Sequence, residues 1–340
     1  MKTLTGILNV SLVILILFIS GGCSPRTDRE VVIYTSVDQI VSEPVLNSFE
    51  KATGIKVMVV YDVEASKTTG LVNRLMAEKD RPKCDVFWNA EFARTIALKK
   101  QGVLTPYHSP SAEDIPAIFR DKEDYWTGFS ARARVLIYNR LLLQEEDLPR
   151  SIFELTDPRW KGKVALAYPL FGTTATQIAA LYATLGKDQT EAYLKALKAN
   201  DVVIVNGNAG VREVVVEGQL PLGFTDSDDV SIAVQSGKPV GQILPDHNGL
   251  GTLLILNTVA LINNGPHPKE GRELIDYLLS REVESRLAFS EAAQIPVRAG
   301  VAKPPNVLDI STITWMKVDY QEVAEKISEA GRFCQTLFVR

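Results

Sequence analysis

The sequence has few of the side chains, and none of the motifs, on which most hydrolytic and phosphoryl-transfer enzymes depend. It contains three histidines and three cysteines in 340 residues. The spacings G-x-S-x-G, H-E-x-x-H and C-x-x-C and the P-loop pattern are absent from it. Only His108, His247 and His267 offer a base that titrates near neutral pH. The sequence therefore predicts that the chain is not an enzyme.

A strong charge of either sign is also missing. Lysine and arginine together number 37, against 41 aspartates and glutamates, so the formal net charge is -4. Proteins that bind nucleic acid usually carry a basic surface, and this balance argues against a nucleic-acid partner and against strong attraction to anionic lipid. Apolar residues make up 46% and charged residues 23% of the chain, as in folded domains generally. The length suits two domains of ordinary size.

One long apolar run occurs, and it lies at the start of the chain. Lys2 precedes it, residues 7–19 are mainly apolar, and Ser20-Gly21-Gly22-Cys23 follows. This order is typical of a secretory signal peptide, which we place at residues 1–22. The segment before Cys23 resembles the bacterial lipobox. The resemblance implies that Cys23 is acylated, that residues 23–30 form a tether, and that the protein is exported and anchored to a membrane by lipid. An ordinary signal peptide with an incidental cysteine is the alternative.

The two remaining cysteines leave a question open. An oxidising compartment would permit a disulfide between Cys84 and Cys334. The apolar residues around Cys84 favour a buried free thiol instead. The sequence does not decide between the two, because it does not show how far apart their α-carbons lie.

Strand-like and helical segments alternate along the rest of the chain. Val31–Tyr34, Ile55–Tyr61 and Cys84–Trp88 are apolar runs that favour strands, and apolar residues recur at helical spacing between them. A second series of strand-like runs occupies residues 134–138, 164–167, 202–205 and 222–224, and two further runs occupy 253–256 and 259–262. Such alternation predicts an α/β fold of two doubly wound lobes, each with a mainly parallel sheet covered by helices.

Polar side chains collect in the loops that follow the predicted strands. In doubly wound sheets, ligands bind beyond the carboxyl ends of the strands, where loops and helix N-termini converge. The candidate ligand-binding residues of these loops are Thr35, Ser36, Asp38, Glu64, Asn89, Glu91, Gly172, Thr173, Thr174, Asn208, Asp226, Ser227 and Asp228. Arg132 joins them, since it and Arg134 share one face of a strand that enters the second lobe. We expect these side chains to meet in a cleft between the lobes.

Each loop also has a simpler interpretation. Serine, threonine, aspartate and asparagine before a helix commonly cap it, and strand-end arginines commonly pair with surface carboxylates. The run Asp226-Ser227-Asp228-Asp229 is more informative, because three carboxylates crowd like charges unless a cation, an amine or a polyol binds them. An exposed acidic helix end is the alternative. Gly249 and Gly251 either absorb a hinge rotation or make turns.

Several segments in this order and spacing resemble one family, the periplasmic solute-binding proteins of ABC importers, in the branch that includes ferric-iron binders. The segments that carry the resemblance are residues 32–39, 49–57, 85–91, 157–163 and 295–298. The resemblance implies the type II periplasmic binding protein fold, with two lobes joined by crossing hinge strands. It also implies an N-lobe of residues 31–127 plus 253–305 and a C-lobe of residues 128–252 plus 306–340.

Ferric binders of this branch hold iron with a donor in the first loop, a glutamate after the third strand and two adjacent tyrosines in the second lobe. The resemblance places Asp38 at the first position and Glu91 one residue beyond the second. Ser227 and Asp228 replace the tyrosine pair. An arginine and a helix N-terminus hold the synergistic anion in the family, and Arg132 and Gly172-Thr173-Thr174 match them here.

Loss of both phenolates leaves the cargo open. A hard cation such as Fe3+ would be held with a synergistic anion by Asp38, Glu91, Asp226 and Asp228, since carboxylate oxygens suit hard metals. The same carboxylates would otherwise accept hydrogen bonds from an organic solute while Arg132 binds its anionic end.

The resemblance therefore implies a substrate-binding lipoprotein of an ABC importer, of the iron(III)-transport type. It would be a monomer that captures a small solute between its lobes and delivers it to a permease in the inner membrane. A binder of a small organic anion, such as a phosphonate or a sugar phosphate, is one alternative. An exported α/β enzyme is the alternative from another class.

Overall fold

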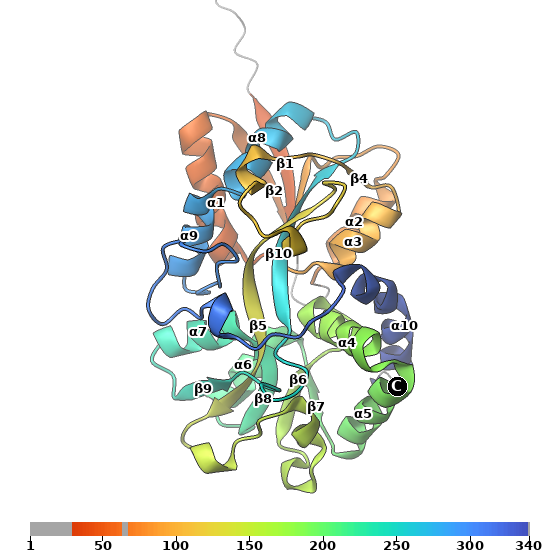
Figure 1. The fold of residues 1–340 in the computed structure, drawn as a ribbon, viewed down its shortest axis with the longest axis vertical. Coiled ribbons are helices and arrows are strands. Elements are labelled where there is room, and N and C mark those ends of the chain that lie inside the picture. Colours follow the sequence, from red (N-terminus) through yellow and green to blue (C-terminus); the bar gives the residue numbers. More distant parts are fainter. Residues whose placement is uncertain (1–28, 63–66, 339–340) are drawn as a thin grey trace, which may run out of the picture.

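A computed structural model describes residues 29–62 and 67–338 of the chain (Figure 1). The predicted signal peptide, the predicted acylation site Cys23 and the candidate ligand-binding residue Glu64 lie outside the described residues. Within these ranges no helix combines the length and the apolar character that crossing a bilayer requires.

The first lobe contains three parallel strands in the order β2-β1-β3, followed by antiparallel β10. Its strands are β1 (Glu30–Thr35), β2 (Lys56–Tyr61), β3 (Val86–Asn89), β4 (Leu104–Thr105) and β10 (Leu254–Ile262). Its helices are α1 (Gln39–Thr53), α2 (Thr69–Ala77), α3 (Ala93–Lys100), α8 (Pro268–Leu278) and α9 (Arg281–Phe289). They lie on both sides of the sheet (Figure 1).

Helix α1 shows how the local sequence produces these elements. Val41, Val45, Leu46 and Phe49 are buried along one face, at the spacing that an amphipathic helix requires. The helix ends at Gly54, whose φ of 69° lies in the left-handed region and whose N–H donates to the Glu50 carbonyl. A side chain with a Cβ is strained in that conformation, so glycine makes an efficient stop.

The second lobe repeats this plan. Its strands are β6 (Val164–Ala167), β7 (Val203–Val205), β8 (Leu222–Asp226) and β9 (Val240–Ile243), and its main helices are α4 (Gly172–Leu185), α5 (Lys187–Ala199), α6 (Gly207–Val216) and α7 (Ser227–Gln235). β8, β6 and β7 are parallel neighbours. Among the described residues, the short 3-10 helices are Pro110–Ala112, Ala117–Phe119, Glu145–Asp147, Ile152–Thr156, Pro158–Trp160 and Ile310–Thr312.

Strand β5 (Thr127–Asn139) joins the two lobes and is buried along its whole length. Residues 127–133 pair with β10, whereas residues 134–139 pair with β8 and β9. Together β5 and β10 form the central vertical connection in Figure 1. The C-terminal helix α10 (Tyr320–Phe338) packs against α4 and α5 of the second lobe and also against α3 of the first. The lobes are therefore joined by strands on one side and by a helix on another.

Strand β10 differs from the two separate runs predicted from the sequence, and the state of the two cysteines is now defined. Apart from Leu253, the runs 253–256 and 259–262 belong to a single buried strand, β10, with a register shift at Leu256/Asn257. The polar Asn257 and Thr258 interrupt the apolar pattern but are buried, since Asn257 donates to Gln294 and Thr258 contacts Thr95. Cys84 and Cys334 are both free and buried.

Gly251 lies where the chain returns to the first lobe, and its backbone is closely packed. Its φ is +83°, and a Cβ built on it would lie 2.6 Å from the Trp315 carbonyl carbon and 2.8 Å from the Met316 nitrogen. Thr252 pairs with the same segment, because its N–H donates to Thr314 and its carbonyl accepts from Met316. This geometry makes Gly251 a packed turn.

We expect Gly251→Ala to lower the free energy of unfolding by about 2–4 kcal/mol, because backbone atoms cannot yield to the new methyl group. Gly237→Ala is the matched control, since Gly237 also has a positive φ (+71°) but no atom within 4 Å of its Cβ position. Strain alone should cost the control about 1 kcal/mol. Urea denaturation of both variants measures the difference, and equal losses would show that crowding at Gly251 is unimportant.

Candidate functional site

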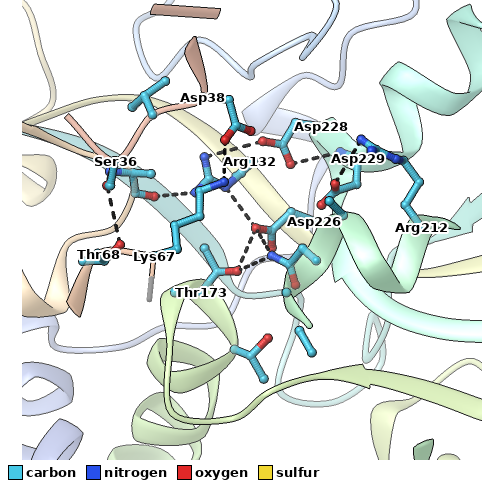
Figure 2. A pocket seen from close by; sticks show the side chains of 18 of the residues that line it. Ser36, Asp38, Lys67, Thr68, Arg132, Thr173, Arg212, Asp226, Asp228 and Asp229 are labelled. Atoms are coloured by element: carbon cyan, nitrogen blue, oxygen red, sulfur yellow. Dashed lines mark hydrogen bonds and ion pairs between the residues drawn. The ribbon is translucent and has the colours of Figure 1, made fainter. Parts of the chain in front are cut away.

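A cavity of about 370 Å³ lies between the two lobes, where loops from both converge (Figure 2). Ser36 and Asp38 follow β1 of the first lobe, and Asp226 and Asp228 stand at the β8–α7 junction of the second. The N-termini of α4 and α6 also line it. The cavity is thus built at the carboxyl ends of strands, as doubly wound sheets favour, and its size suits a small solute.

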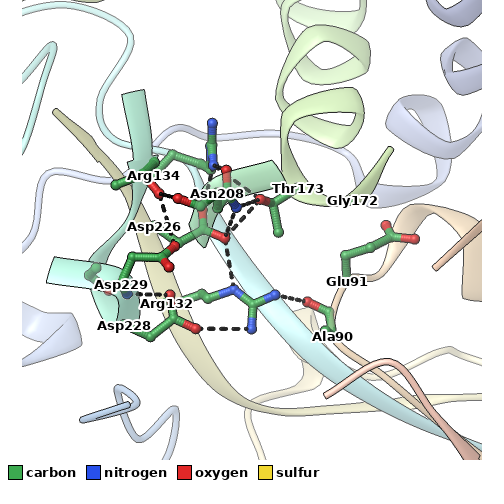
Figure 3. A network of polar contacts seen from close by, with 12 residues as sticks. Ala90, Glu91, Arg132, Arg134, Gly172, Thr173, Asn208, Asp226, Asp228 and Asp229 are labelled. Carbon is green, nitrogen blue, oxygen red and sulfur yellow. Dashed lines mark hydrogen bonds and ion pairs between the residues drawn. The ribbon is translucent and has the colours of Figure 1, made fainter. Parts of the chain in front are cut away.

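The Asp226 carboxylate is the centre of a buried polar network on the wall of this cavity (Figure 3). Its oxygens accept hydrogen bonds from Arg134 Nη1 at 2.6 Å and Arg132 Nε at 3.1 Å. They also accept from the Thr173 hydroxyl at 2.7 Å and from Asn208 Nδ2 at 2.9 Å. Burial alone would raise the pKa of Asp226, but the charges of Arg134 and Arg132 hold it below its ordinary value.

Strand geometry explains why these groups meet. Arg132 and Arg134 occupy alternate positions of β5 and share a face, and Arg134 lies opposite Asp226 in the antiparallel β5–β8 pair. Thr173 and Asn208 come from the first turns of α4 and α6. The network therefore fixes the start of two helices against the strand that connects the lobes.

Asp228 and Asp229 form the acidic part of the cavity. Carboxylate oxygens of Asp226, Asp228 and Asp229 lie within 4.8 Å of one another. Asp228 lies 3.5 Å from Arg132 Nη1, and Asp229 lies 3.5 Å from Arg212 Nη1. Burial raises the pKa of Asp228 to about 6, and burial with the neighbouring Asp228 and Asp226 charges raises the pKa of Asp229 to about 8. The two acids thus favour an added cation or hydrogen-bond donor.

The first-lobe wall is organised around Ser36. Its hydroxyl donates to Asn89 Oδ1 at 2.7 Å and accepts from the Ala90 N–H at 2.9 Å. Asp38 forms an ion pair with Lys67 at 2.5 Å, and both line the cavity (Figure 2). The Ala90 carbonyl accepts from Arg132 Nη2 at 2.6 Å. Arg132 therefore contacts the first lobe through backbone and the second through carboxylates.

The structure brings most of the predicted site residues together. The candidates that line the cavity are Ser36, Asp38, Arg132, Gly172, Thr173, Thr174, Asn208, Asp226 and Asp228. Thr35, Asn89, Glu91 and Ser227 are buried outside its lining. Their polar atoms serve the fold: the Thr35 hydroxyl accepts from the Val37 N–H, and the Ser227 hydroxyl accepts from the Ala133 N–H.

The Glu91 side chain points away from Asp226 and Asp228 (Figure 3). Its carboxylate accepts from the N–H groups of Ala93 at 2.6 Å and Arg94 at 3.1 Å, at the start of α3. The capping interpretation that applies to polar residues before helices therefore describes Glu91. The carboxylate cluster contains Asp229 in place of Glu91 and Asp38.

Sequence reasoning missed several residues of the lining. Arg212 is one of them, and it lies one helical turn after Asn208 on α6, so the i, i+4 spacing contained the signal. Asp229 was part of the acidic run but was not selected as a ligand. Tyr168 and Phe171, whose rings stack at 5.5 Å, gave no signal, because isolated aromatics usually belong to the core.

The fold and the interlobe cavity define a two-lobed binding protein, and comparison with known proteins agrees. The model of the family described as bacterial extracellular solute-binding protein matches residues 82–322, so the chain belongs to this family. The family prediction made from the sequence is confirmed.

Three similar proteins illustrate the range of the family. "Iron uptake protein A1" of Synechocystis sp. is 26% identical over 288 residues, which cover 82% of this chain and 78% of that protein. The protein named "Putative 2-aminoethylphosphonate-binding periplasmic protein" from Salmonella typhi is 28% identical over 261 residues, covering 75% and 73%. The crystal structure of iron-bound HitA from Pseudomonas aeruginosa superposes with a TM-score of 0.83 at 22% identity, covering 92% of this chain and all of that one. The predicted fold is confirmed.

The raised pKa of Asp229 gives a prediction about stability and pH. The pKa of an aspartate in the unfolded chain is near 3.9. Between about pH 4 and pH 8 this group is therefore ionised in the unfolded chain but still protonated in the folded one. The free energy of unfolding consequently falls as pH rises through this range. Asp229→Asn removes this loss. We expect the melting temperature of the variant, relative to the unmodified chain, to increase from pH 5 to pH 8 and then level off. A constant difference over this range would contradict the assignment.

Replacing Asp226 should destabilise the fold, because its carboxylate pairs with two buried guanidinium groups. We expect Asp226→Asn to cost about 3–5 kcal/mol of folding free energy, the usual penalty for breaking a buried ion pair. Asp201→Asn is the control, since the Asp201–Lys161 pair is exposed and separated by 3.5 Å, and its loss should cost less than about 1 kcal/mol. Similar denaturation midpoints for the two variants would argue against the central role of Asp226.

Proposed function

We propose that the chain is the solute-binding component of an ABC importer, which captures a small solute between its lobes and delivers it to a membrane permease. The observation that carries the proposal is the cavity itself, because its polar lining is contributed by loops of both lobes. A solute held there would contact both walls and favour the closed arrangement. Family membership supports an exported protein. Acylation of Cys23 would anchor it to the membrane, where we propose that it acts as a monomer.

Iron(III) with a synergistic anion is the first candidate cargo. Its support is the carboxylate cluster of Asp226, Asp228 and Asp229 and the similarity to an iron uptake protein. Since Asp226 already accepts four hydrogen bonds, Asp228 and Asp229 would supply the carboxylate ligands. The N-termini of α4 and α6 would bind the anion, because their N–H groups and helix dipoles favour negative charge.

A small organic anion that also carries an amine or hydroxyl groups is the second candidate. Its specific support is the charge pattern of the lining, in which Lys67, Arg132 and Arg212 are as much a part of the cavity as the acids. An aminoalkylphosphonate or a sugar phosphate would place its anionic group at the helix N-termini and its donors against Asp228 and Asp229. The similarity to a protein named for 2-aminoethylphosphonate agrees with this pattern.

Thermal shifts measured with ferric citrate, 2-aminoethylphosphonate and fructose 6-phosphate test the proposal and separate the two cargoes. A ligand at 100 times its Kd stabilises the folded state by about 2.7 kcal/mol, which corresponds to a rise of several degrees in melting temperature. We expect one class of probe to produce this rise and Asp228→Ala to abolish it.

Asp188→Ala is the matched control, because Asp188 is exposed and occupies the second position of α5, as Asp228 does in α7. It should retain the full shift. A shift that survives Asp228→Ala would place the ligand outside the acidic wall, and the absence of any shift with ferric citrate would exclude the iron interpretation.

A further inference from the structure

Three hydrogen bonds connect the two lobes at the first turn of α4. The Thr176 hydroxyl donates to Glu91 Oε2 at 2.9 Å, and Arg94 Nη2 donates to the Leu170 carbonyl at 2.8 Å. The Gly172 N–H donates to the Lys67 carbonyl at 3.2 Å. Glu91, Arg94, Leu170 and Thr176 do not line the cavity. The Thr176–Glu91 and Arg94–Leu170 contacts therefore hold the lobes together beside the binding site, whereas the Gly172–Lys67 contact lies in its lining.

Glu91 is suited to such a contact because its own lobe fixes its position. It is fully buried, and the N–H groups of Ala93 and Arg94 hold the carboxylate at the start of α3. Asn89 Nδ2 of the same lobe also donates to Glu91 Oε1 at 3.3 Å, and the Thr176 hydroxyl of the other lobe donates to Oε2. A hydrogen bond to a charged acceptor is roughly twice as strong as one between neutral groups, so this contact contributes more to closure than an ordinary surface contact.

We infer that Glu91 and Thr176 form a latch that sets the population of the closed conformation whether or not a solute is present. This inference rests on the capture function proposed above. Neither residue lines the cavity, so both would act on binding by holding the lobes in position. The apparent affinity of a protein whose binding-competent state is partly populated falls in proportion to that population. Breaking the latch therefore weakens every ligand by the same factor and leaves selectivity unchanged.

Arg94 reinforces the latch from the same helix turn. Its guanidinium reaches the Leu170 carbonyl across the interface, while its Nη1 is buried with no hydrogen-bond partner in the described structure. Burial lowers the pKa of Arg94, although the Glu91 charge opposes this effect. The Leu170 carbonyl compensates in part for the hydration that the Arg94 guanidinium loses in the closed arrangement.

Hydrogen exchange of the ligand-free full chain tests the inference without any ligand. The Gly172 N–H is the first amide of α4 and has no helical acceptor, so its protection reports its contact with Lys67 of the other lobe. We expect Thr176→Val, which keeps the side-chain shape, to accelerate exchange at Gly172 about tenfold, the size expected for losing a hydrogen bond to a charged group. Exchange at the Ala131–Ile295 bridge should not change. Ala131 lies in the part of β5 that pairs with β10 of the first lobe, so this contact does not cross the interface between the lobes.

Thr190→Val is the matched control, since Thr190 is also buried and donates only within its own helix, to the Gly186 carbonyl. It should leave exchange at Gly172 unchanged, and Thr176→Ser should restore the exchange rate of the unmodified chain. Equal exchange in Thr176→Val and the unmodified chain would overturn the latch, as would equal acceleration in Thr190→Val. Rapid exchange at Gly172 in the unmodified chain would also overturn it.

A binding measurement then separates the latch from the proposed function. For any of the three probes that binds, Thr176→Val should weaken the affinity by the factor by which the closed population falls, as calculated from the Gly172 exchange of both chains. The ratio between two binding probes should stay constant. A changed ratio would contradict the latch. If no probe binds but Thr176→Val still opens the ligand-free chain, the latch stands and the proposed cargo is wrong.

Discussion

The buried carboxylate of Asp226 is the interaction on which the rest of the site depends. It forms ion pairs with Arg132 and Arg134 of the connecting strand β5 and accepts hydrogen bonds from the first turns of α4 and α6. A buried ion pair stabilises a fold best when its remaining hydrogen bonds are made. Here four donors surround the carboxylate, although Arg134 Nε is buried without a partner in the described structure. Arg134 is further enclosed by the Phe224 ring, 4.4 Å from its guanidinium carbon. The network thereby holds the N-termini of α4 and α6 in the lining of one cavity.

This arrangement divides the acids of the β8–α7 junction between two tasks. Asp226 is used by the fold, whereas Asp228 and Asp229 face the cavity with raised pKa values and one arginine each. A solute with a cationic or donor group would relieve their mutual repulsion, and an anionic group would meet the helix N-termini opposite. The lining thus presents groups of both signs, which would suit a solute that carries two opposite charges. That pattern is compatible with a cation and its anion or with one organic molecule that carries both.

Much of the fold followed from the sequence because local signals agreed with one another. The strand-helix alternation and the shared face of Arg132 and Arg134 depend on residues close in the chain. What could not be predicted depends on distant partners. Asn257 and Thr258 look like an interruption until Gln294 and Thr95 are placed against them. Glu91 looks like a ligand until the start of α3 is known, and only then does its carboxylate become a helix cap and an interlobe contact.

Native mass spectrometry of the protein purified without added ligand tests the central claim most directly, because it asks whether the cavity holds cargo from the cell. The account predicts one bound mass on the unmodified chain, either a metal with an anion or a small organic acid, and its absence from a chain with both Asp228 and Asp229 changed to alanine. The same mass on both proteins would place the cargo elsewhere and contradict the interlobe site.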